Sequence, residues 1–573
     1  MTRSMDSVAE QNRLLLQILD LHPTQGSSSK TTLVEVASNV PAGRGLVFTE
    51  NVAPGQSLLS LPGDALINVK TYRHFFHTDV LPPVKSVAGS SKASSCSLSS
   101  PQALSLLLSR AKCELLQSQN GTPSNGSDVK CQTLQLFLQT LPKSFDTVPL
   151  RWAVYASTVG QAESLGAQEG DGEDCIQAKA RFYDSLLQSL PRHSHELLTK
   201  VNERFDRDWT RIKSLRDSDV DKLVNPLRLA ADVGKAREVV RSIDLSTFLW
   251  AWLCVNSRCV FLPLGLADHS DNFTLAPVLD MANHTSDLAL ECKAQYSSGS
   301  GLDLCAPPEA NRPSGSSRRG LSKGDECLIT YGPHSNETLL SEYGFALPTS
   351  LSYLADHNQD GSWRGNRYAE VLVDEDIEAM LKEQGSQGER KIELLQDRGY
   401  WGDFSVHPYP EPAHPSHRLV PALRLIALEL ADVATDQGKV FKAAKLTQNR
   451  GGPKPAKLKK PAEVSAGYKA VEKLLEKWEA TLTGYEDRVS DENEHEAHKV
   501  LSTISERRLK KTQQLHKSLE AASQILSTGL ITQLSTEKRS GCEASLAMVT
   551  QLVCEQAEIL KLVSQAACDG VEW

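Results

Sequence analysis

The chain has 573 residues, and at about 150 residues per domain this length predicts more than one domain. Apolar residues make up 40% and charged residues 23%, which is ordinary for a globular protein with a large core. The 62 basic and 71 acidic side chains leave a net charge of −9, which argues against a protein that coats nucleic acid. We therefore expect no nucleic-acid partner, although a basic protein substrate is compatible with this charge.

Neither a membrane segment nor a metal site is expected. No apolar run approaches the roughly 18 residues that cross a bilayer, and the first residues are too polar for a signal peptide. The twelve cysteines form no Cys-x-x-Cys or Cys-x-Cys pair, so neither a structural zinc site nor a disulfide framework is indicated. These features predict a cytoplasmic or nuclear protein without a bound metal and without a membrane partner.

The amino-terminal part mixes short strands with turns, and helices follow it. Apolar runs between turn signals predict strands at 32–36, 45–48 and 57–61. A helix that is apolar on most faces, and therefore buried, is expected to run through Val255 with Asp244 or Ser246 as its N-cap.

The chain from about residue 350 onward is expected to be mainly helical. Apolar residues recur at helical spacing around 419–430, 471–482, 497–524 and 548–563. A solvated linker is predicted at 442–461, where basic residues alternate with Gly and Pro. The pattern favours an α+β chain with a helical carboxyl-terminal part.

Four segments, 41–48, 255–261, 275–284 and 324–345, carry residue types that suit a ligand site. Two glycines in the first allow backbone amides to approach a ligand closely, and Arg258 in the second could clamp a carboxylate by two parallel hydrogen bonds. The third ends in a polar Asp-x-x-Asn-His set, and the fourth leads from Gly-Asp-Glu into a strand expected to end at Tyr-Gly. Each alone could also be a tight turn, a surface ion pair or a core strand.

Taken together and in this order, the four segments resemble the SET-domain methyltransferases. The particular form is similar to the RubisCO large-subunit lysine methyltransferase class, most strongly over 241–346. The resemblance implies a SET β-fold with a knot-like crossing of two late segments, which is an exception to the rule that chains avoid threading. It implies a SET domain at 1–346 with a helical insertion at roughly 85–245, followed by a helical substrate-binding-like domain at 347–573.

The resemblance also implies roles for individual residues. Tyr331 corresponds to the catalytic tyrosine, whose hydroxyl would orient the methyl group and the target nitrogen. Ser257 and Tyr343 correspond to the substrate side of the site. The cofactor, S-adenosyl-L-methionine, would be held by the residues that match the family's cofactor site, namely Ala42, Gly43, Arg44, Arg258, Asp280, Asn283, His284 and Tyr331.

The implied activity is S-adenosylmethionine-dependent N-methylation of lysine in a non-histone protein, such as a ribosomal protein, by a monomeric enzyme. Because an ammonium has no lone pair, the lysine must lose its proton before it attacks the methyl group. A narrow, dry, aromatic channel favours the neutral amine. The chain lacks a cysteine-rich segment after the core, which argues against the zinc-bearing histone-methylating subfamilies.

One departure from the class leaves the target residue open. Where the plant enzymes have another channel tyrosine, this chain has Leu290, and the nearest tyrosine is Tyr296. Two alternatives therefore stand beside lysine methylation. One is histidine methylation by the same fold, and the other is a non-catalytic scaffold that keeps the fold for protein binding.

Overall fold

The computed structural model describes residues 2–23, 32–85, 95–117, 128–158, 173–224, 233–268, 271–298, 301–309, 321–348, 365–429, 466–527 and 535–573. The chain divides into two compact units. The first comprises Met1–Tyr353, Gly365–Tyr368 and Leu515–Val553, and the second comprises Leu354–Arg364, Ala369–Gln514 and Cys554–Trp573. The linker predicted at 442–461 lies outside the described residues.

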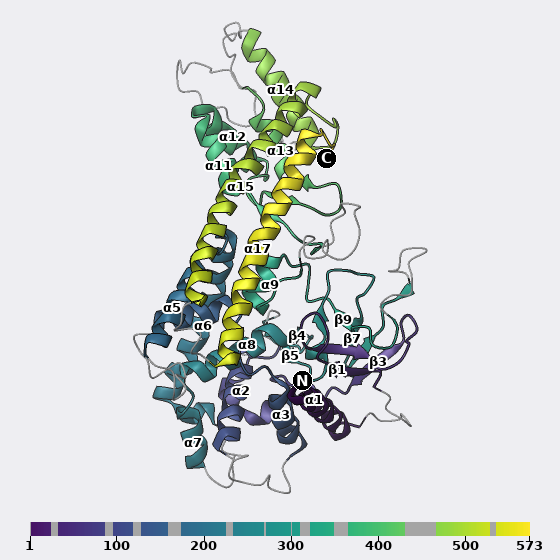
Figure 1. Ribbon diagram of the computed structural model, residues 1–573, viewed down its shortest axis with the longest axis vertical. Coiled ribbons are helices and arrows are strands. Elements are labelled where there is room, and N and C mark those ends of the chain that lie inside the picture. Colours follow the sequence, from purple (N-terminus) through teal and green to yellow (C-terminus); the bar gives the residue numbers. More distant parts are fainter. Residues whose placement is uncertain are drawn as a thin grey trace, which may run out of the picture. The chain divides into compact units, whose positions relative to one another are not determined.

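The first unit contains small sheets that gather in one region beside α8 and α9 (Figure 1). β1 pairs antiparallel with β2, β4 pairs antiparallel with β5, β8 lies between β3 and β7, and β6 pairs with β9 in parallel. The strands are β1 (Val34–Ala37), β2 (Gly45–Phe48), β3 (Ser57–Leu61), β4 (Cys259–Phe261), β5 (Phe273–Leu275), β6 (Asn283–His284), β7 (Lys293–Ser297), β8 (Gly301–Cys305) and β9 (Leu328–Ile329). The predicted strands at 45–48 and 57–61 are confirmed as β2 and β3, and the one predicted at 32–36 starts two residues later.

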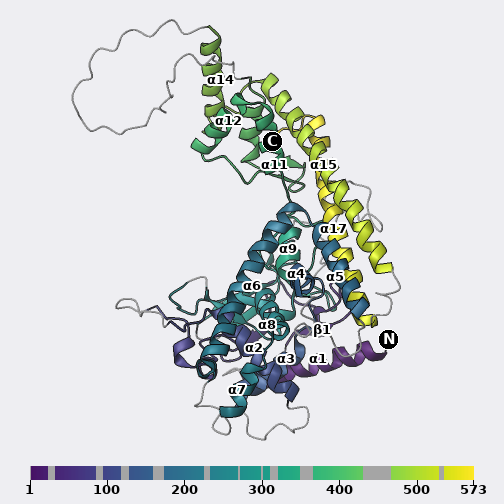
Figure 2. The same cartoon turned by 90° about the vertical axis from the view of Figure 1, so that its left-hand side faces the viewer.

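Helices fill the sequence between β3 and β4, and they cluster around α8 (Figure 2). The helices of this unit are α1 (Thr2–Leu21), α2 (Ser100–Gln117), α3 (Val129–Thr140), α4 (Pro149–Thr158), α5 (Glu173–Gln188), α6 (Arg192–Ser218), α7 (Val233–Arg241), α8 (Leu245–Arg258) and α9 (Asn336–Tyr343), with short 3-10 turns η1 (Arg73–Phe75), η2 (Thr78–Val80), η3 (Val220–Leu223) and η5 (Leu279–Met281).

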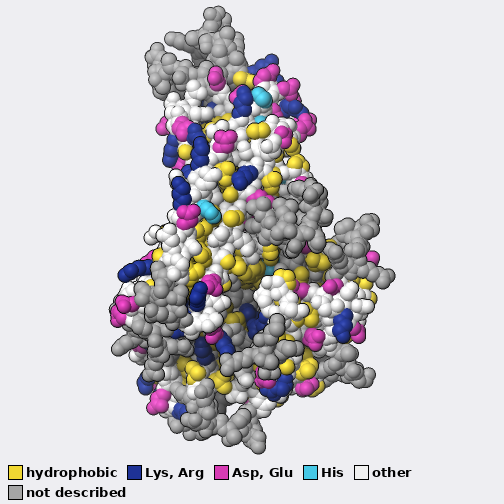
Figure 3. Space-filling view, viewed as in Figure 1, with side chains coloured by type: hydrophobic (Ala, Val, Ile, Leu, Met, Phe, Trp, Pro, Cys, Tyr) yellow, Lys and Arg dark blue, Asp and Glu magenta, His cyan; other side chains and the backbone are white. Residues whose placement is uncertain are grey.

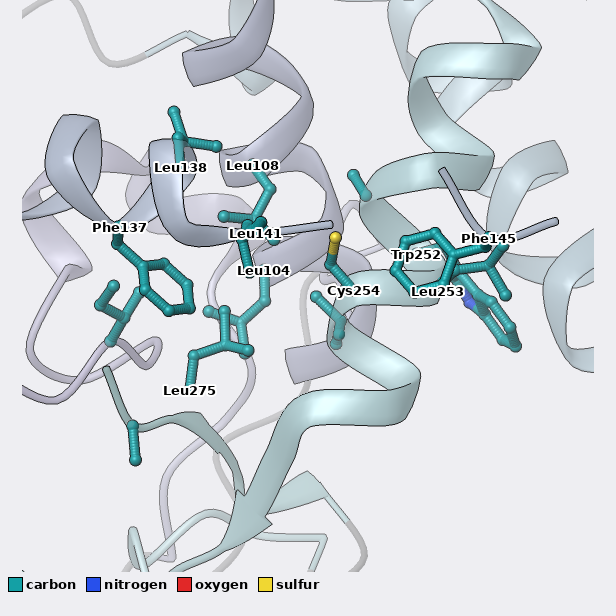
Figure 4. Close-up of a cluster of buried hydrophobic side chains, with 14 of the residues drawn as sticks. Leu104, Leu108, Phe137, Leu138, Leu141, Phe145, Trp252, Leu253, Cys254 and Leu275 are labelled. Atoms are coloured by element: carbon teal, nitrogen blue, oxygen red, sulfur yellow. The ribbon is translucent and has the colours of Figure 1, made fainter. Parts of the chain in front are cut away.

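The buried core of the first unit joins these helices to the strands. Figure 4 shows one part of it, where α2, α3 and α8 meet through Leu104, Leu108, Phe137, Leu138, Leu253 and Cys254, with Leu275 of β5 beside them. Each such side chain stabilises the fold by about 1.5–3 kcal/mol when it is fully buried. The core therefore fixes α8, whose last residue is Arg258, relative to the sheets.

The start of α8 is set by its N-cap. The Asp244 carboxylate accepts a hydrogen bond from the Thr247 amide at 2.7 Å, which satisfies one of the free amides of the first turn. The predicted helix and the Asp244 cap are confirmed, and the alternative cap at Ser246 is wrong because Ser246 lies inside the first turn. α8 ends at Arg258, where the chain turns directly into β4.

The second unit is mainly helical, as the sequence predicts. Its own elements are β10 (Val371–Leu372), β11 (Ser405–His407), β12 (His414–Pro415), α11 (Asp374–Glu383), α12 (Ser386–Asp397), α13 (Leu419–Ile426) and α14 (Ala466–Leu482), while α15 (Asp491–Ser527) and α17 (Thr536–Cys568) contribute residues to both units. The last two helices are longer at both ends than the sequence predicts. The expected α+β class is confirmed.

Surface charge and helix composition describe the outside of the molecule. On the face drawn in Figure 3, the basic and acidic side chains of the described residues are interspersed. Within the described ranges, no helix has the length and apolar character that a membrane span requires. The same ranges hold no cluster of three metal-ligating His, Cys, Asp or Glu side chains.

Candidate active site

Three segments far apart in the sequence meet at the centre of the first unit. β6 pairs in parallel with β9, with Asn283 opposite Leu328, and the Thr285 amide extends the pairing to the Ile329 carbonyl at 2.9 Å. The residues before β9 pair instead with β2, because the Cys327 amide donates to the Leu46 carbonyl at 2.8 Å. The Gly-Asp-Glu segment is therefore held between the 41–48 turn region and the Asn-His strand, as expected for the crossing.

The Asn283 amide ties these three segments together. Its Nδ2 donates to the Arg44 carbonyl at 2.9 Å and to Oε1 of Glu326 at 2.7 Å. Burial raises the pKa of Glu326, and the hydrogen bond from Asn283 opposes that rise. Gly45 passes so close that a Cβ there would lie 2.5 Å from Nδ2 of Asn283. Glu326 was quoted in the sequence motif but given no role, since its partner lies 43 residues away.

Arg258 at the end of α8 forms an ion pair with Asp280 in η5. Its Nη1 donates to the Asp280 carboxylate and to the Asp280 carbonyl, both at 2.9 Å. The Asp280 side chain is 0% exposed, and burial raises its pKa against the opposing effect of Arg258. Burial, followed by the Arg258 charge, lowers the pKa of Arg44, and the Asp280 charge opposes that lowering. Arg258 Nε and Asp280 Oδ1 are buried without a hydrogen-bond partner.

His284 is neutral and its tautomer is defined by a hydrogen bond. Burial, together with nearby His334, lowers the pKa of His284 to about 4. Its Nδ1 accepts the Tyr331 amide at 3.0 Å, so the ring proton belongs on Nε2. That Nε2 is buried without a hydrogen-bond partner. A backbone interaction with Ile329 opposes the lowering of the pKa of His284.

Tyr331 is partly buried near the middle of the fourth segment. Its hydroxyl donates to the Ala282 carbonyl at 2.8 Å. Burial chiefly raises the pKa of Tyr331, and Arg258, Asp280, Tyr343 and Glu326 are close enough to perturb that pKa further. The phenol therefore stays protonated at neutral pH and lies within electrostatic reach of the Arg258–Asp280 pair.

Aromatic rings surround Tyr331. Its ring centroid lies 5.1 Å from that of Tyr343, 5.2 Å from that of His284 and 6.0 Å from that of Phe345. His334 also approaches, because its Nε2 lies 3.2 Å from the Tyr331 carbonyl. Phe345 and His334 were not predicted as site residues. They follow Tyr331 closely in sequence, so an aromatic-rich stretch was the signal that could have found them.

The remaining residues that the sequence singles out for this site are Ala42, Gly43, Ser257 and Leu290. Ala42 and Gly43 are exposed in the turn before Arg44, and the Gly43 amide donates to the Val40 carbonyl at 2.8 Å. The Ser257 hydroxyl donates to the Leu253 carbonyl of its own helix at 2.7 Å. Leu290 lies in a turn that its amide forms with the Asp287 carbonyl. Their roles toward a ligand stay predictions.

The predicted strand through Tyr331 is wrong at its end. β9 stops at Ile329, because the amide of Tyr331 binds the His284 side chain instead of a neighbouring strand. This exchange of a ladder hydrogen bond for a side-chain hydrogen bond turns the Tyr331 phenol towards Ala282.

The sequence of this chain is similar to those of known proteins. No protein-family model matches the chain. Over 177 residues it is 29% identical to "Ribosomal lysine N-methyltransferase set11" of Schizosaccharomyces pombe, which covers 31% of this chain and 36% of that protein. Over 236 residues it is 27% identical to "Ribosomal lysine N-methyltransferase 2" of Saccharomyces cerevisiae, covering 39% and 43%. Over 197 residues it is 32% identical to "SET domain-containing protein 4" of Homo sapiens, covering 34% and 38%.

A solved structure described as "Crystal structure of the SET domain of LSMT bound to Lysine and AdoHcy" superposes with a TM-score of 0.42 and 13% identity, over 98% of this chain and 93% of that chain. The sequence matches span less than half the length of each of the three named relatives. These relatives confirm the resemblance to SET-domain lysine methyltransferases that the four motifs predict.

Proposed function

We propose that this chain is an S-adenosylmethionine-dependent protein-lysine N-methyltransferase that acts on a non-histone protein. The observation that carries the proposal is the setting of Tyr331. Its protonated phenol binds the Ala282 carbonyl, packs among Tyr343 and Phe345, and lies within reach of the Arg258 charge. The names of the sequence relatives, two of which are ribosomal lysine N-methyltransferases, support the same reaction.

The residues around Asp280 fit the proposed cofactor. Arg258 pairs with Asp280 and keeps an Nε without a partner, and the charge of Arg44 interacts with both groups. This surplus of positive charge suits the carboxylate of the cofactor's methionine portion. The unused Nε2 donor of His284 suits an acceptor on the same molecule. S-adenosylmethionine supplies a methyl group bound to a sulfonium centre.

The aromatic residues would prepare the attacking amine. Removal from water raises the pKa of both Tyr331 and Tyr343. The same surroundings would disfavour a charged ammonium and so favour the neutral lysine. Because Tyr331 gives its proton to Ala282, its oxygen remains an acceptor that can orient an N–H of the amine. Such orientation can supply several kcal/mol, up to about 7–11 in intramolecular models. The raised pKa of Tyr331 means that the phenol positions the amine and does not deprotonate it.

The substrate class we propose is ribosomal protein. Two relatives are named for ribosomal lysine methylation, and the net charge of −9 suits basic substrates. Enzymes with such substrates would work in the cytoplasm or the nucleus. We propose that the enzyme acts as a monomer. We assign catalysis to the SET domain at 1–346, with its helical insertion at 85–245, and substrate binding to 347–573.

The proposal is tested by label transfer. Ribosomal proteins extracted from cells that lack this chain are incubated with methyl-labelled S-adenosylmethionine and the purified protein, then hydrolysed to amino acids. Label in methylated lysine is the expected result. Label in methylhistidine would replace lysine by histidine as the target, and an absence of transfer would contradict the enzymatic function.

A further inference from the structure

Glu342, the residue before Tyr343, is held by two other helices. Arg204 on α6 donates from Nη2 to both carboxylate oxygens of Glu342 at 2.6 Å each. Asn256 on α8 donates from Nδ2 to Oε2 of Glu342 at 2.9 Å, and Arg204 donates to the Asn256 side-chain oxygen at 3.4 Å. The three residues, which we call the Glu342 clamp, form a closed set of contacts between α6, α8 and α9.

The clamp also fixes the end of α9. The Nδ2 of Asn256 donates to the backbone carbonyl of Glu342 at 3.1 Å. Carbonyls in the last turn of a helix have no partner within the helix, so this contact satisfies one of them. Gly344 follows with φ of 81°, and the chain leaves the helix there. Asn256 therefore holds the last turn of α9, which carries Tyr343 and leads through Gly344 to Phe345.

α6 can hold α9 because it is itself anchored. Near its start, the Ser194 hydroxyl donates to Glu337 in the first turn of α9 at 2.6 Å. Further along, the Asp208 carboxylate accepts from the Trp252 indole of α8 at 2.9 Å. The Arg204 guanidinium lies 5.8 Å from the centre of the same indole. α6 thus contacts the helices that carry Arg258 and Tyr343 at several points, and Figure 2 shows the three helices side by side.

The clamp is too exposed to be explained by stability alone. The side chains of Arg204 and Glu342 are 39% and 24% exposed, and ion pairs of that exposure contribute at most about 1 kcal/mol. Its effect on the neighbouring phenol is direct, since burial and then the Glu342 charge raise the pKa of Tyr343 while Arg204 lowers it. The Glu342 clamp therefore affects Tyr343, whose ring lies beside that of Tyr331.

We propose that Arg204, Asn256 and Glu342 are positioning residues that hold Tyr343 against Tyr331 and so control the rate of methyl transfer and the number of methyl groups added. This inference rests on the proposed methyltransferase function. The clamp residues touch neither substrate nor cofactor in this proposal, and they act through the backbone and ring of Tyr343. A displaced Tyr343 would widen the space around the amine.

The test compares Arg204→Ala, Glu342→Gln, the double variant and Arg204→Lys with the wild type. Arg192→Ala is the matched control, because Arg192 lies on the same helix in an exposed ion pair with Glu196. The readouts are kcat and KM on extracted ribosomal proteins, the ratio of mono-, di- and trimethyl-lysine, and the Kd of S-adenosylmethionine by calorimetry. Unfolding temperatures show that each variant is folded.

We expect Arg204→Ala and Glu342→Gln to lower kcat about tenfold and to change the methyl-lysine ratio, with the cofactor Kd unchanged. The double variant should be no worse than Arg204→Ala alone, because both changes break the Arg204–Glu342 contact. Arg204→Lys should recover part of the loss, since lysine keeps the charge without the fork. If Arg204→Ala fails to fold, the kcat and methyl-lysine ratio of Glu342→Gln and Arg204→Lys test the inference instead.

Two results would overturn the inference. One is an unchanged kcat and methyl-lysine ratio in every folded clamp variant while the wild type is active. The other is an equal loss in the Arg192→Ala control. A wild-type protein that transfers no methyl group would instead remove the proposed function, and the inference with it.

Discussion

The side-chain amide of Asn283 donates a hydrogen bond to the backbone carbonyl of Arg44, a residue 239 positions earlier in the chain. The same amide binds Glu326, so one side chain joins the amino-terminal turn, the Asn-His strand and the Gly-Asp-Glu segment. A donor shared between a carbonyl and a half-buried carboxylate leaves little room for change. The crossing of these segments therefore depends on the size of the residues around Asn283.

We predict that Gly45→Ala disrupts this crossing. The new Cβ would lie 2.5 Å from Nδ2 of Asn283 and 2.8 Å from Oε1 of Glu326, so these groups must move. Overpacking of this kind costs about 1–3 kcal/mol. Thermal unfolding and cofactor titration measure the effect. Gly63→Ala is the matched control, because a Cβ there meets nothing within 4 Å. Equal stability of the two variants would contradict the prediction.

Tyr331→Phe should lower methyl transfer by about a hundredfold while cofactor binding stays within a few-fold of the wild type. The substitution keeps the ring but removes the oxygen that would orient the amine. Turnover on extracted ribosomal proteins and calorimetric titration separate the two effects. Tyr485→Phe removes the same hydroxyl from a side chain that is 87% exposed, so it should behave as the wild type. Wild-type turnover in Tyr331→Phe would show that another group orients the amine.

His284 should make stability depend on pH. Its pKa is about 4 in the folded protein and near 6.5 when unfolded. Between these values the unfolded chain binds a proton that the folded chain does not, so the free energy of unfolding falls as pH drops from about 6.5 to 4. The slope is on the order of 1 kcal/mol per pH unit. Above pH 6.5 the full stability is present.

The pH effect is measured by urea unfolding of the wild type and of His284→Gln between pH 4 and 7. The glutamine oxygen can still accept the Tyr331 amide, and the variant should lose part of the slope. His407 also has a pKa lowered to about 4, so His407→Gln should reduce the slope too. The exposed His516 supplies the control variant His516→Gln. A full wild-type slope in His284→Gln would refute the assignment.

In the second unit, Lys391 stabilises the end of α13. Its buried ammonium donates to the Ile426 carbonyl at 3.0 Å, the Leu428 carbonyl at 2.6 Å and the Gln384 side chain at 2.7 Å. Lys391→Met would remove the donor to the Leu428 carbonyl and to the Gln384 side-chain oxygen, at a cost of about 1–3 kcal/mol, while the Ile426 carbonyl keeps the Gln384 amide at 3.2 Å. Unfolding measurements should show this loss and no loss for Lys382→Met, whose side chain is 68% exposed. An equal free energy of unfolding in both variants would argue against this stabilising role of Lys391.

Local features of the fold were predictable from sequence. The Asp244 cap, the buried α8 and the bounds of β2 and β3 depend on neighbours within a few residues. The end of β9 was mispredicted, because the amide of Tyr331 pairs with the side chain of a residue 47 positions away. Strand patterns give no sign of such an exchange.

The site was predictable only through motif resemblance. That resemblance led to Asn283, Arg258, Asp280 and Tyr331, which the structure brings into contact or electrostatic reach. It did not lead to the Glu342 clamp, because Arg204 lies 138 residues before Glu342 and on an unremarkable helical face. Contacts of that span appear only once helices are packed.

We propose that the Arg258–Asp280 pair and its surroundings bind S-adenosylmethionine. Calorimetric titration of the purified chain with this compound tests it most directly, with Arg258→Lys and the Arg192→Ala control in parallel. We expect binding by the wild type and the control, and about tenfold weaker binding by Arg258→Lys, because lysine lacks the two-pronged donor of the guanidinium group. No detectable binding by the wild type, or unchanged affinity in Arg258→Lys, would contradict it.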